Sequence, residues 1–174
     1  TQDIYWIEAF VEIQSVLLLR VSSHVDKGVS HPQFFDPPYP LKYLQAGLAR
    51  YREMKVDILD GWIRPMGDGE IRDYIAKIRP DLMVVSASSF DVDVADGYIA
   101  AVKKQEKSPL VIGIGQGYYP NGVRKKDFGK NYDAILLGEP EQEFFQLFEQ
   151  IRACDQAAPR WKEDYRRLYT EGRR

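Results

Sequence analysis

The sequence is poor in metal-binding and nucleophilic side chains. Its 174 residues include one cysteine, Cys154, and two histidines, His24 and His31. A single cysteine excludes an internal disulfide framework, and it excludes a cysteine-ligated zinc site or iron–sulfur cluster built by this chain alone. The histidines share one stretch, and no nucleophile stands in an order that brings it to them. We therefore expect neither a metal ligand nor a catalytic residue here.

A charge excess and a long apolar run are also missing. The net charge is −2 and the pI is about 5.8, so no broad basic face is expected and a nucleic-acid partner is disfavoured. Arg20 ends the aliphatic run 16–19, and no stretch approaches the roughly 20 apolar residues of a membrane span. No signal peptide is recognisable. We expect a soluble, cytoplasmic protein, and the initial Thr1 suggests a processed or excised piece of a longer one.

Short apolar runs alternate with amphipathic segments along most of the chain. The runs are apolar on both faces for most of their length, as in a parallel sheet covered by helices on both sides. The strands are predicted at Val16–Val21, Lys55–Leu59, Leu82–Ser86, Leu110–Ile114 and Ala134–Leu137. The helices are predicted at Leu41–Arg52, Gly69–Ile78, Val92–Lys107 and Pro140–Arg152.

This alternation predicts an α/β fold, a doubly wound parallel five-stranded sheet of the flavodoxin-like, Rossmann-like type. The domain spans residues 15–153. Residues 1–14 form an N-terminal extension, and residues 154–174 form a charged C-terminal helix or linker.

In such a sheet, ligands bind beyond the carboxyl ends of the strands. Two phosphate motifs are absent after the first strand: the dinucleotide fingerprint G-x-G-x-x-G and the P-loop. The loop that follows carries four prolines and three aromatic residues up to Pro40. It is either a surface loop that packs on itself or a lid over a large flat ligand.

Small residues end the third and fourth strands. Ser86-Ala87-Ser88-Ser89 offers hydroxyl groups, or it is a turn that caps the next helix. Gly113, Gly115 and Gly117 alternate at the end of the fourth strand, which indicates a bulge or the close approach of a ligand. We favour a ligand, because the two segments are expected to be neighbours in the sheet.

The fifth strand ends in Gly138-Glu139-Pro140. Gly138 allows a tight turn from strand to helix. Glu139 either accepts hydrogen bonds from a ligand or serves as an acidic residue at the helix N-terminus.

Five segments, in order, resemble the cobalamin-binding domain of B12-dependent radical SAM enzymes. They are Pro37–Leu48, with the family's P-P-x-G/P-L-x-Y-L pattern; Val56–Asp60; Pro80–Ser88; Val111–Gly117; and Tyr132–Glu141, with a D-x-V-V-x-G-E-like ending. The resemblance covers roughly residues 37–152. Each motif alone is weak, and their order and spacing together are fairly specific.

The resemblance implies a cofactor site for cobalamin. On it, apolar residues press on the corrin, small residues line a channel for the nucleotide tail, and polar groups bond the corrin amides. The expected cofactor-binding residues are Pro38, Leu41, Ser86, Ser88, Phe90, Gly113, Gly115, Gln116, Gly117, Tyr118, Gly138 and Glu139.

Departures from the family pattern refine this expectation. Relatives with a histidine cobalt ligand carry D-x-H-x-x-G after the first strand, whereas here Ser22 replaces the aspartate and His24 stands four residues before Gly28. We therefore expect base-off cobalamin without the usual histidine ligand. Ile114 interrupts the usual glycine pair, and Pro140 stands where the family has glycine.

The resemblance also implies a partner, a radical SAM core in cis or in trans, of methyltransferase or cyclase type. That core binds S-adenosylmethionine and a 4Fe-4S cluster through C-x-x-x-C-x-x-C, a motif absent here. The chain is then a module that is not catalytic alone. Two alternatives are a Rossmann-like interaction or scaffold domain that has lost its cofactor, and a flavodoxin-like binder of flavin or nucleotide.

Overall fold

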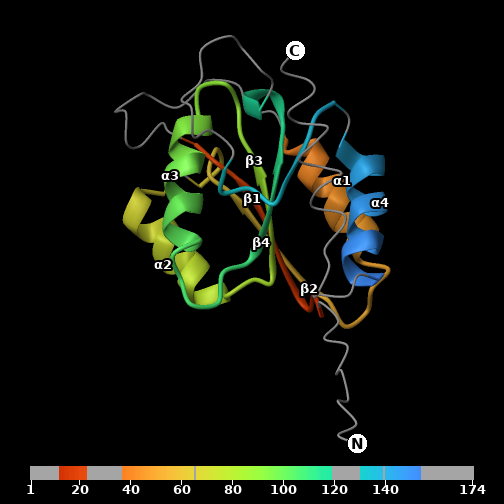
Figure 1. Cartoon of the computed structure of the whole chain (residues 1–174). Helices are drawn as coiled ribbons and strands as arrows, with labels where there is room; N and C mark the ends of the chain where they lie inside the picture. Colours follow the sequence, from red (N-terminus) through yellow and green to blue (C-terminus); the bar gives the residue numbers. More distant parts are fainter. Residues whose placement is uncertain (1–11, 23–36, 65, 119–129, 139, 154–174) are drawn as a thin grey trace, which may run out of the picture.

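The computed structural model describes residues 12–22, 37–64, 66–118, 130–138 and 140–153. Strands and helices alternate along these residues (Figure 1). The strands are β1 Ser15–Arg20, β2 Lys55–Asp60, β3 Leu82–Ser86, β4 Leu110–Ile114 and β5 Ala134–Leu136. The helices are α1 Tyr39–Leu48, α2 Asp68–Ile78, α3 Val92–Val102 and α4 Pro140–Ala153, with a short 3-10 helix, η1, at Gln116–Tyr118.

All five strands are parallel and lie in the order β2-β1-β3-β4-β5. This confirms the predicted doubly wound sheet and its flavodoxin-like strand order. The predicted segments 1–14 and 154–174 lie outside the described residues, apart from residues 12–14.

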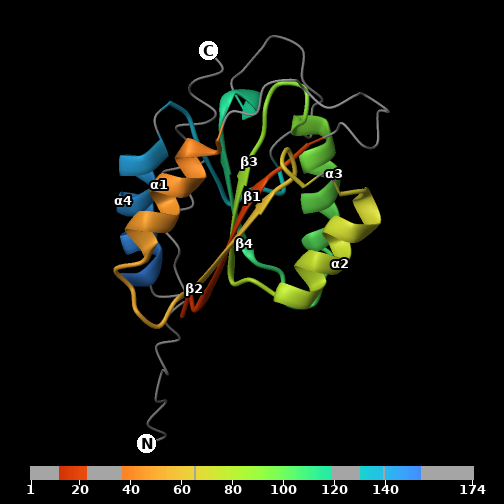
Figure 2. The same cartoon turned by 180° about the vertical axis from the view of Figure 1, so that it is seen from behind.

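Two layers of helices cover the sheet, α2 and α3 on one face and α1 and α4 on the other (Figures 1 and 2). Alternate residues of β1 serve the two layers: Leu17 and Leu19 face α2 and α3, whereas Val16 and Leu18 face α1 and α4. All four are fully buried, and each such aliphatic side chain contributes about 1.5–3 kcal/mol relative to exposure. Strands that are apolar on both faces therefore form the central layer.

Two helices are shorter or shifted relative to the sequence prediction. Helix α1 starts two residues earlier, because Pro40 fits the first helical turn, where a backbone N–H has no partner in the helix. Helix α3 ends at Val102 instead of Lys107. The polar stretch after it makes turn bonds from Lys104 and Gln105, and Pro109 disfavours helix just before it.

Asp133 fixes the amino end of β5 to its neighbours. One carboxylate oxygen accepts hydrogen bonds from the Lys103 ammonium at 2.5 Å and from the Val111 N–H at 2.8 Å. The same ammonium donates to the Pro109 carbonyl at 2.8 Å. This network joins α3, β4 and β5 at the end of the sheet where the strands begin.

Candidate functional site

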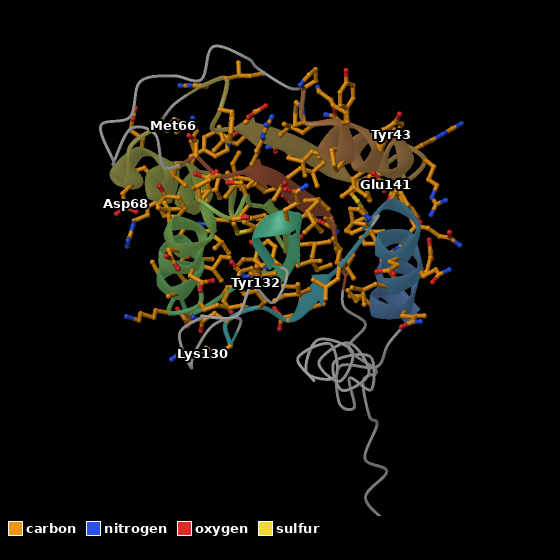
Figure 3. All side chains as sticks on the ribbon, turned by 90° about the horizontal axis from the view of Figure 1, so that it is seen from above. Tyr43, Met66, Asp68, Lys130, Tyr132 and Glu141 are labelled. Carbon is orange, nitrogen blue, oxygen red and sulfur yellow. The ribbon has the colours of Figure 1, made fainter. Side chains whose placement is uncertain are left out.

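The carboxyl ends of the strands and the N-termini of the helices meet at one edge of the molecule, here called the carboxyl edge. Figure 3 looks down on it. The strand order reverses between β1 and β3, since β1 connects to β2 on one side and β3 lies on the other. Ligand sites of open α/β sheets lie at such a reversal. The geometry therefore makes this edge the candidate site.

Large apolar side chains are exposed at this edge. Among the described residues, the exposed large hydrophobic residues are Tyr39 (59% exposed), Tyr43 (62%), Ile63 (63%) and Phe90 (81%). The tyrosines lie in the first turns of α1, Ile63 follows β2, and Phe90 follows β3. We call these four residues the apolar rim. The four residues come from three segments that begin or end at this edge.

The serine segment after β3 forms a turn that begins α3. Ser88 Oγ donates a hydrogen bond to Asp91 Oδ2 at 2.6 Å and accepts one from the Phe90 N–H at 3.2 Å. Asp91 stands at the N-cap position of α3, but it makes no side-chain capping bond to the helix, and the Ser88 bonds stabilise the turn before the helix instead. Ser86 is half-buried at the end of β3. The turn holds Phe90 outward on the apolar rim.

The glycine segment after β4 lies directly against the serine segment, as predicted. Ile114 pairs with Ser86, and the Gly117 N–H donates to the Ala87 carbonyl at 2.9 Å. A Cβ at Gly117 would lie 2.4 Å from the Ser88 carbonyl oxygen. At Gly115, where φ is +104°, it would lie 2.9 Å from that of Ala87. The close approach that these glycines permit is made by the chain's own backbone.

Gly113 meets aromatic rings of the core. A Cβ there would lie 3.0 Å from Tyr118 Cε1 and Cζ and 3.1 Å from Tyr132 Cδ1. Tyr118 is completely buried, and Tyr132 is 3% exposed. Their hydroxyl oxygens are 3.1 Å apart. On this face of β4 the space beside Gly113 is therefore filled by side chains, and Tyr118 offers no exposed surface.

Burial and its neighbours shift the ionisation of Tyr132. Loss of solvation is the main cause that raises the pKa of Tyr132 well above 10.0, and the adjacent Tyr118 and Asp96 raise it further. The hydroxyl therefore keeps its proton, and its capacity to donate a hydrogen bond, even near pH 10, where an exposed tyrosine begins to ionise.

The other expected site residues have different surroundings. Leu41 is 1% exposed and packs in the layer of α1 and α4. Pro38, three residues before it, is also buried. Gln116 and Gly138 are exposed at the carboxyl edge, where Gly138 has a φ of +98°. Glu139 lies outside the described residues. Ser86, Ser88, Gly115 and Gly117 are thus brought together, whereas Leu41, Gly113 and Tyr118 belong to the core.

A charged and aromatic cluster at the ends of β1 and β2 was not anticipated from the sequence. Arg20 pairs with Asp60, with 3.6 Å between Nη1 and Oδ2, and its guanidinium lies 4.6 Å from the centroid of the Trp62 ring. Trp62 donates from its ring to the Val21 carbonyl, and Asp60 Oδ2 accepts no hydrogen bond from the part of the chain that the structure describes. The available signal was that Arg20 and Asp60 both end apolar strands.

Neither a membrane span nor a metal cluster is present among the described residues. No helix there is long and apolar enough to cross a membrane. No cluster of three or more histidine, cysteine, aspartate or glutamate side chains there is arranged to hold a metal ion.

Comparison with known proteins gives a similarity of fold. No protein-family model matches the chain, and no curated protein matches it. TsrM from Kitasatospora setae, a radical S-adenosylmethionine methyltransferase, is similar in two structures at 19% identity. With tryptophan and a SAM analogue bound, its TM-score is 0.56, over 79% of this chain and 26% of TsrM. With cobalamin and a [4Fe-4S] cluster bound, the TM-score is 0.54, over 80% and 25%.

OxsB, a cobalamin-dependent S-adenosylmethionine radical enzyme, is similar with a TM-score of 0.53 and 12% identity. The match covers 81% of this chain and 19% of OxsB. This chain thus spans about a quarter of TsrM and a fifth of OxsB. Its fold occurs as part of larger cobalamin-dependent radical SAM enzymes, which supports the resemblance in sequence at the level of fold.

Proposed function

We propose that this chain is a cobalamin-binding module of a B12-dependent radical SAM enzyme. The observation that carries the proposal is the apolar rim at the carboxyl edge of a sheet whose fold recurs in TsrM and OxsB. A corrin is broad, with apolar faces and an edge of amide groups. An exposed apolar surface next to exposed polar groups such as Gln116 suits it better than it suits a small polar ligand.

Some of the expected site residues fit the cofactor, whereas others are buried in the core. Tyr43, Ile63 and Phe90 supply apolar surface for the corrin, and Gln116 supplies an amide that can bond a corrin amide. Gly138, which is exposed after β5, remains part of the proposed site, and Glu139 remains a proposed site residue outside the described ones. Bound cobalamin supplies the group-transfer chemistry of cobalt, and this chain's residues bind and orient it.

The nucleotide tail is proposed to enter beside Ser86. Strand residues alternate between the faces of a sheet, so Ser86 shares the face of Leu82 and Val84, which pack toward α1 and α4. The opposite face at Gly113 is filled by Tyr118 and Tyr132. Only the face of Ser86, with Gly115 next to it, therefore remains for the predicted channel.

The proposed binding mode is base-off. Ser22, two residues beyond β1, is 3% exposed and takes the place of the aspartate of the histidine motif, and both histidines lie outside the described residues. The proposed partner is a radical SAM core, in cis or in trans, that holds S-adenosylmethionine and a 4Fe-4S cluster. This module would present cobalamin to that core from the carboxyl edge.

Equilibrium dialysis of the purified chain against hydroxocobalamin and, in parallel, flavin mononucleotide tests the proposal. At about 50 µM of either compound we expect binding of hydroxocobalamin with a Kd in the micromolar range, about −8 kcal/mol, and no binding of the flavin. Ser86→Leu should weaken binding at least tenfold. The control Gly97→Ala, on the exposed side of α3 with no atom within 4 Å of the added carbon, should leave it unchanged.

Two results would overturn the proposal. Binding of the flavin without cobalamin would establish the flavodoxin-like alternative. Binding of neither compound by the folded chain would contradict a module that binds cobalamin on its own and would favour the alternative of a domain that has lost its cofactor.

A further inference from the structure

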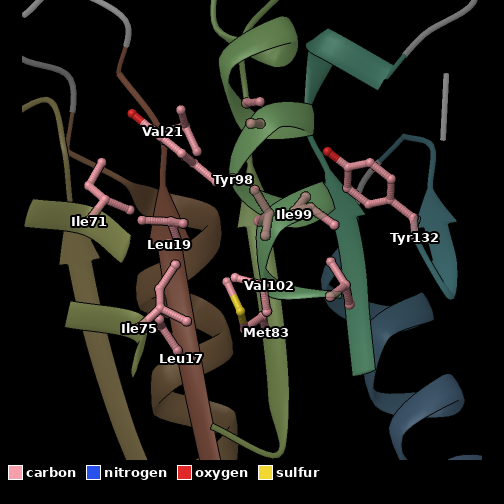
Figure 4. Packing of buried hydrophobic residues seen from close by; sticks show 14 of the residues in the cluster. Leu17, Leu19, Val21, Ile71, Ile75, Met83, Tyr98, Ile99, Val102 and Tyr132 are labelled. Carbon is pink, nitrogen blue, oxygen red and sulfur yellow. The ribbon is translucent and has the colours of Figure 1, made fainter. Parts of the chain in front are cut away.

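The segment Gly115–Tyr118, here called the glycine loop, is attached to the molecule at two points. At its start, Gly115 and Gly117 lie on the backbone of Ala87 and Ser88. At its end, the Tyr118 ring enters the core, where it meets Tyr132 edge-on, with ring centroids 5.1 Å apart and planes at 74°. Figure 4 shows the Tyr132 ring beside β4. The loop is thus held between a backbone contact and an aromatic plug.

The plug depends on the missing side chain at Gly113. Both rings lie within about 3 Å of the position that a Cβ would occupy, as given above. Tyr118 is part of η1, and its N–H donates to the Gly115 carbonyl at 3.3 Å. A shift of the Tyr118 ring therefore moves the backbone of η1, and with it Gln116 and the Gly117 N–H that bonds Ala87.

We propose that Tyr118 and Tyr132 are positioning residues that set the glycine loop, and through it Gln116, against the serine segment at the cofactor edge. This rests on the proposed function. Tyr118 then acts on the ligand without touching it, unlike the direct contact expected from the sequence. The hydroxyl contact at 3.1 Å joins the loop to the entry of β5, so both strands that flank the site share one fixed point.

The energetics favour a fixed arrangement of the pair. A buried hydrogen bond between hydroxyls contributes about 0.5–1.5 kcal/mol net, and Asp96 remains beside Tyr132 as a second neighbour, so rotation of either ring out of the pair is disfavoured by about this amount. An edge-to-face aromatic pair adds about 0.5–1.5 kcal/mol beyond the burial of its area. Because the loop connects directly to this pair, little freedom remains for Gln116 before a ligand arrives, and preorganisation of this kind raises affinity.

The test uses variants that disturb the plug from two sides. Tyr118→Phe removes one hydroxyl and keeps the ring, whereas Gly113→Ala pushes on both rings from β4. The control is Val102→Ala, at the far end of α3 in the same buried cluster, which lowers stability without touching the loop. Two quantities are measured at a temperature where every variant is folded: the Kd for hydroxocobalamin and the hydrogen-exchange rate of the Gly117 amide.

We expect Tyr118→Phe and Gly113→Ala to raise the Kd about tenfold and to speed exchange at Gly117, which donates to Ala87. Val102→Ala should change neither. The proposal would be overturned if, in both plug variants, the exchange rate of the Gly117 amide and the Kd for hydroxocobalamin stayed within twofold of their values in the unchanged chain. Equal effects in Val102→Ala would overturn it as well, because the plug would then act only through global stability.

The exchange measurement separates this proposal from the proposed function, since it needs no cofactor. If the unchanged chain binds no cobalamin while exchange at Gly117 rises in the plug variants, the proposed function fails and the anchoring of the loop stands. If cobalamin binds and exchange does not change, the anchoring fails and the proposed function stands.

Discussion

Gly115 and Gly117 show how single residues shape the carboxyl edge. Gly115 has a φ of +104°, a conformation that residues with a Cβ rarely adopt, and Gly117 leaves no room for a side chain beside the Ser88 carbonyl. The two glycines bring two strand ends into backbone contact. Space at this edge is consequently smaller than three alternating glycines in a sequence suggest.

Gly117→Ala should lower the free energy of unfolding by about 2 kcal/mol or more, because the new carbon would lie 2.4 Å from a backbone oxygen. Gly97→Ala is the matched control. Gly97 is in the interior of α3 with nothing near its Cβ position, so the change should raise the free energy by up to about 1 kcal/mol. Urea unfolding measures both. Equal effects from the two substitutions would show that the close approach at Gly117 is absent.

The buried Tyr132 hydroxyl gives stability a dependence on alkaline pH. Above about pH 10 a tyrosine in the unfolded chain loses its proton, whereas Tyr132, whose pKa is raised mainly by burial, keeps its proton in the folded state. The folded state then binds more protons, so this contribution is complete below pH 10 and is lost as the pH rises toward the folded pKa.

Tyr132→Phe should remove this pH dependence. Between about pH 10 and 11 the free energy of unfolding of the unchanged chain should fall more steeply than that of the variant, by about 1.4 kcal/mol per pH unit. Tyr51, whose pKa is also raised, is present in both proteins and cancels in the comparison. Parallel pH profiles in denaturant titrations would contradict the buried, protonated state of Tyr132.

At the scale of elements, the pattern of the sequence was sufficient for the sheet and less so for the helix ends. β3 and β4 have the predicted bounds, because Leu82–Ser86 and Leu110–Ile114 are short apolar runs that follow Pro80 and Pro109. The end of α3 was placed too late, because the polar residues after Val102 fit an exposed helical turn as well as the observed turns. The start of α1 at Tyr39 was not predicted, because Pro40 fits both a loop and the first turn of a helix.

The site was less predictable than the fold, because sequence spacing does not show what fills a space. The nearness of Ser86 to Ile114 followed from strand order and is confirmed. The filling of the space at Gly113 was not foreseeable, since Tyr132 is 14 residues from Tyr118 along the chain. Arg20 and Asp60 likewise become neighbours only through the pairing of β1 with β2.

The hydrogen bonds and ion pair of Asp133 should stabilise the junction of α3, β4 and β5. Asp133→Ala leaves the Lys103 ammonium and the Val111 N–H without this acceptor, so we expect a loss of about 3 kcal/mol in the free energy of unfolding. Lys107→Ala removes a pair whose lysine is 86% exposed and should change stability by less than about 0.5 kcal/mol. Denaturant unfolding of both variants measures the difference, and a loss below 1 kcal/mol for Asp133→Ala would contradict the assigned role.

Among the described residues, the two ends of the sheet differ in their exposed apolar side chains. The Asp133 network closes the amino end, whereas the exposed large hydrophobic residues among the described ones lie at the carboxyl edge. The exposed apolar side chains thus lie at the end of the sheet where the cofactor site is proposed.

Gel filtration of the chain after incubation with excess hydroxocobalamin tests the central claim most directly. We predict about one corrin per chain in the protein peak, with the absorbance bands of base-off cobalamin, and a clear reduction in the double variant Tyr43→Ser, Phe90→Ser, which removes part of the apolar rim. A folded, colourless protein peak would contradict the claim.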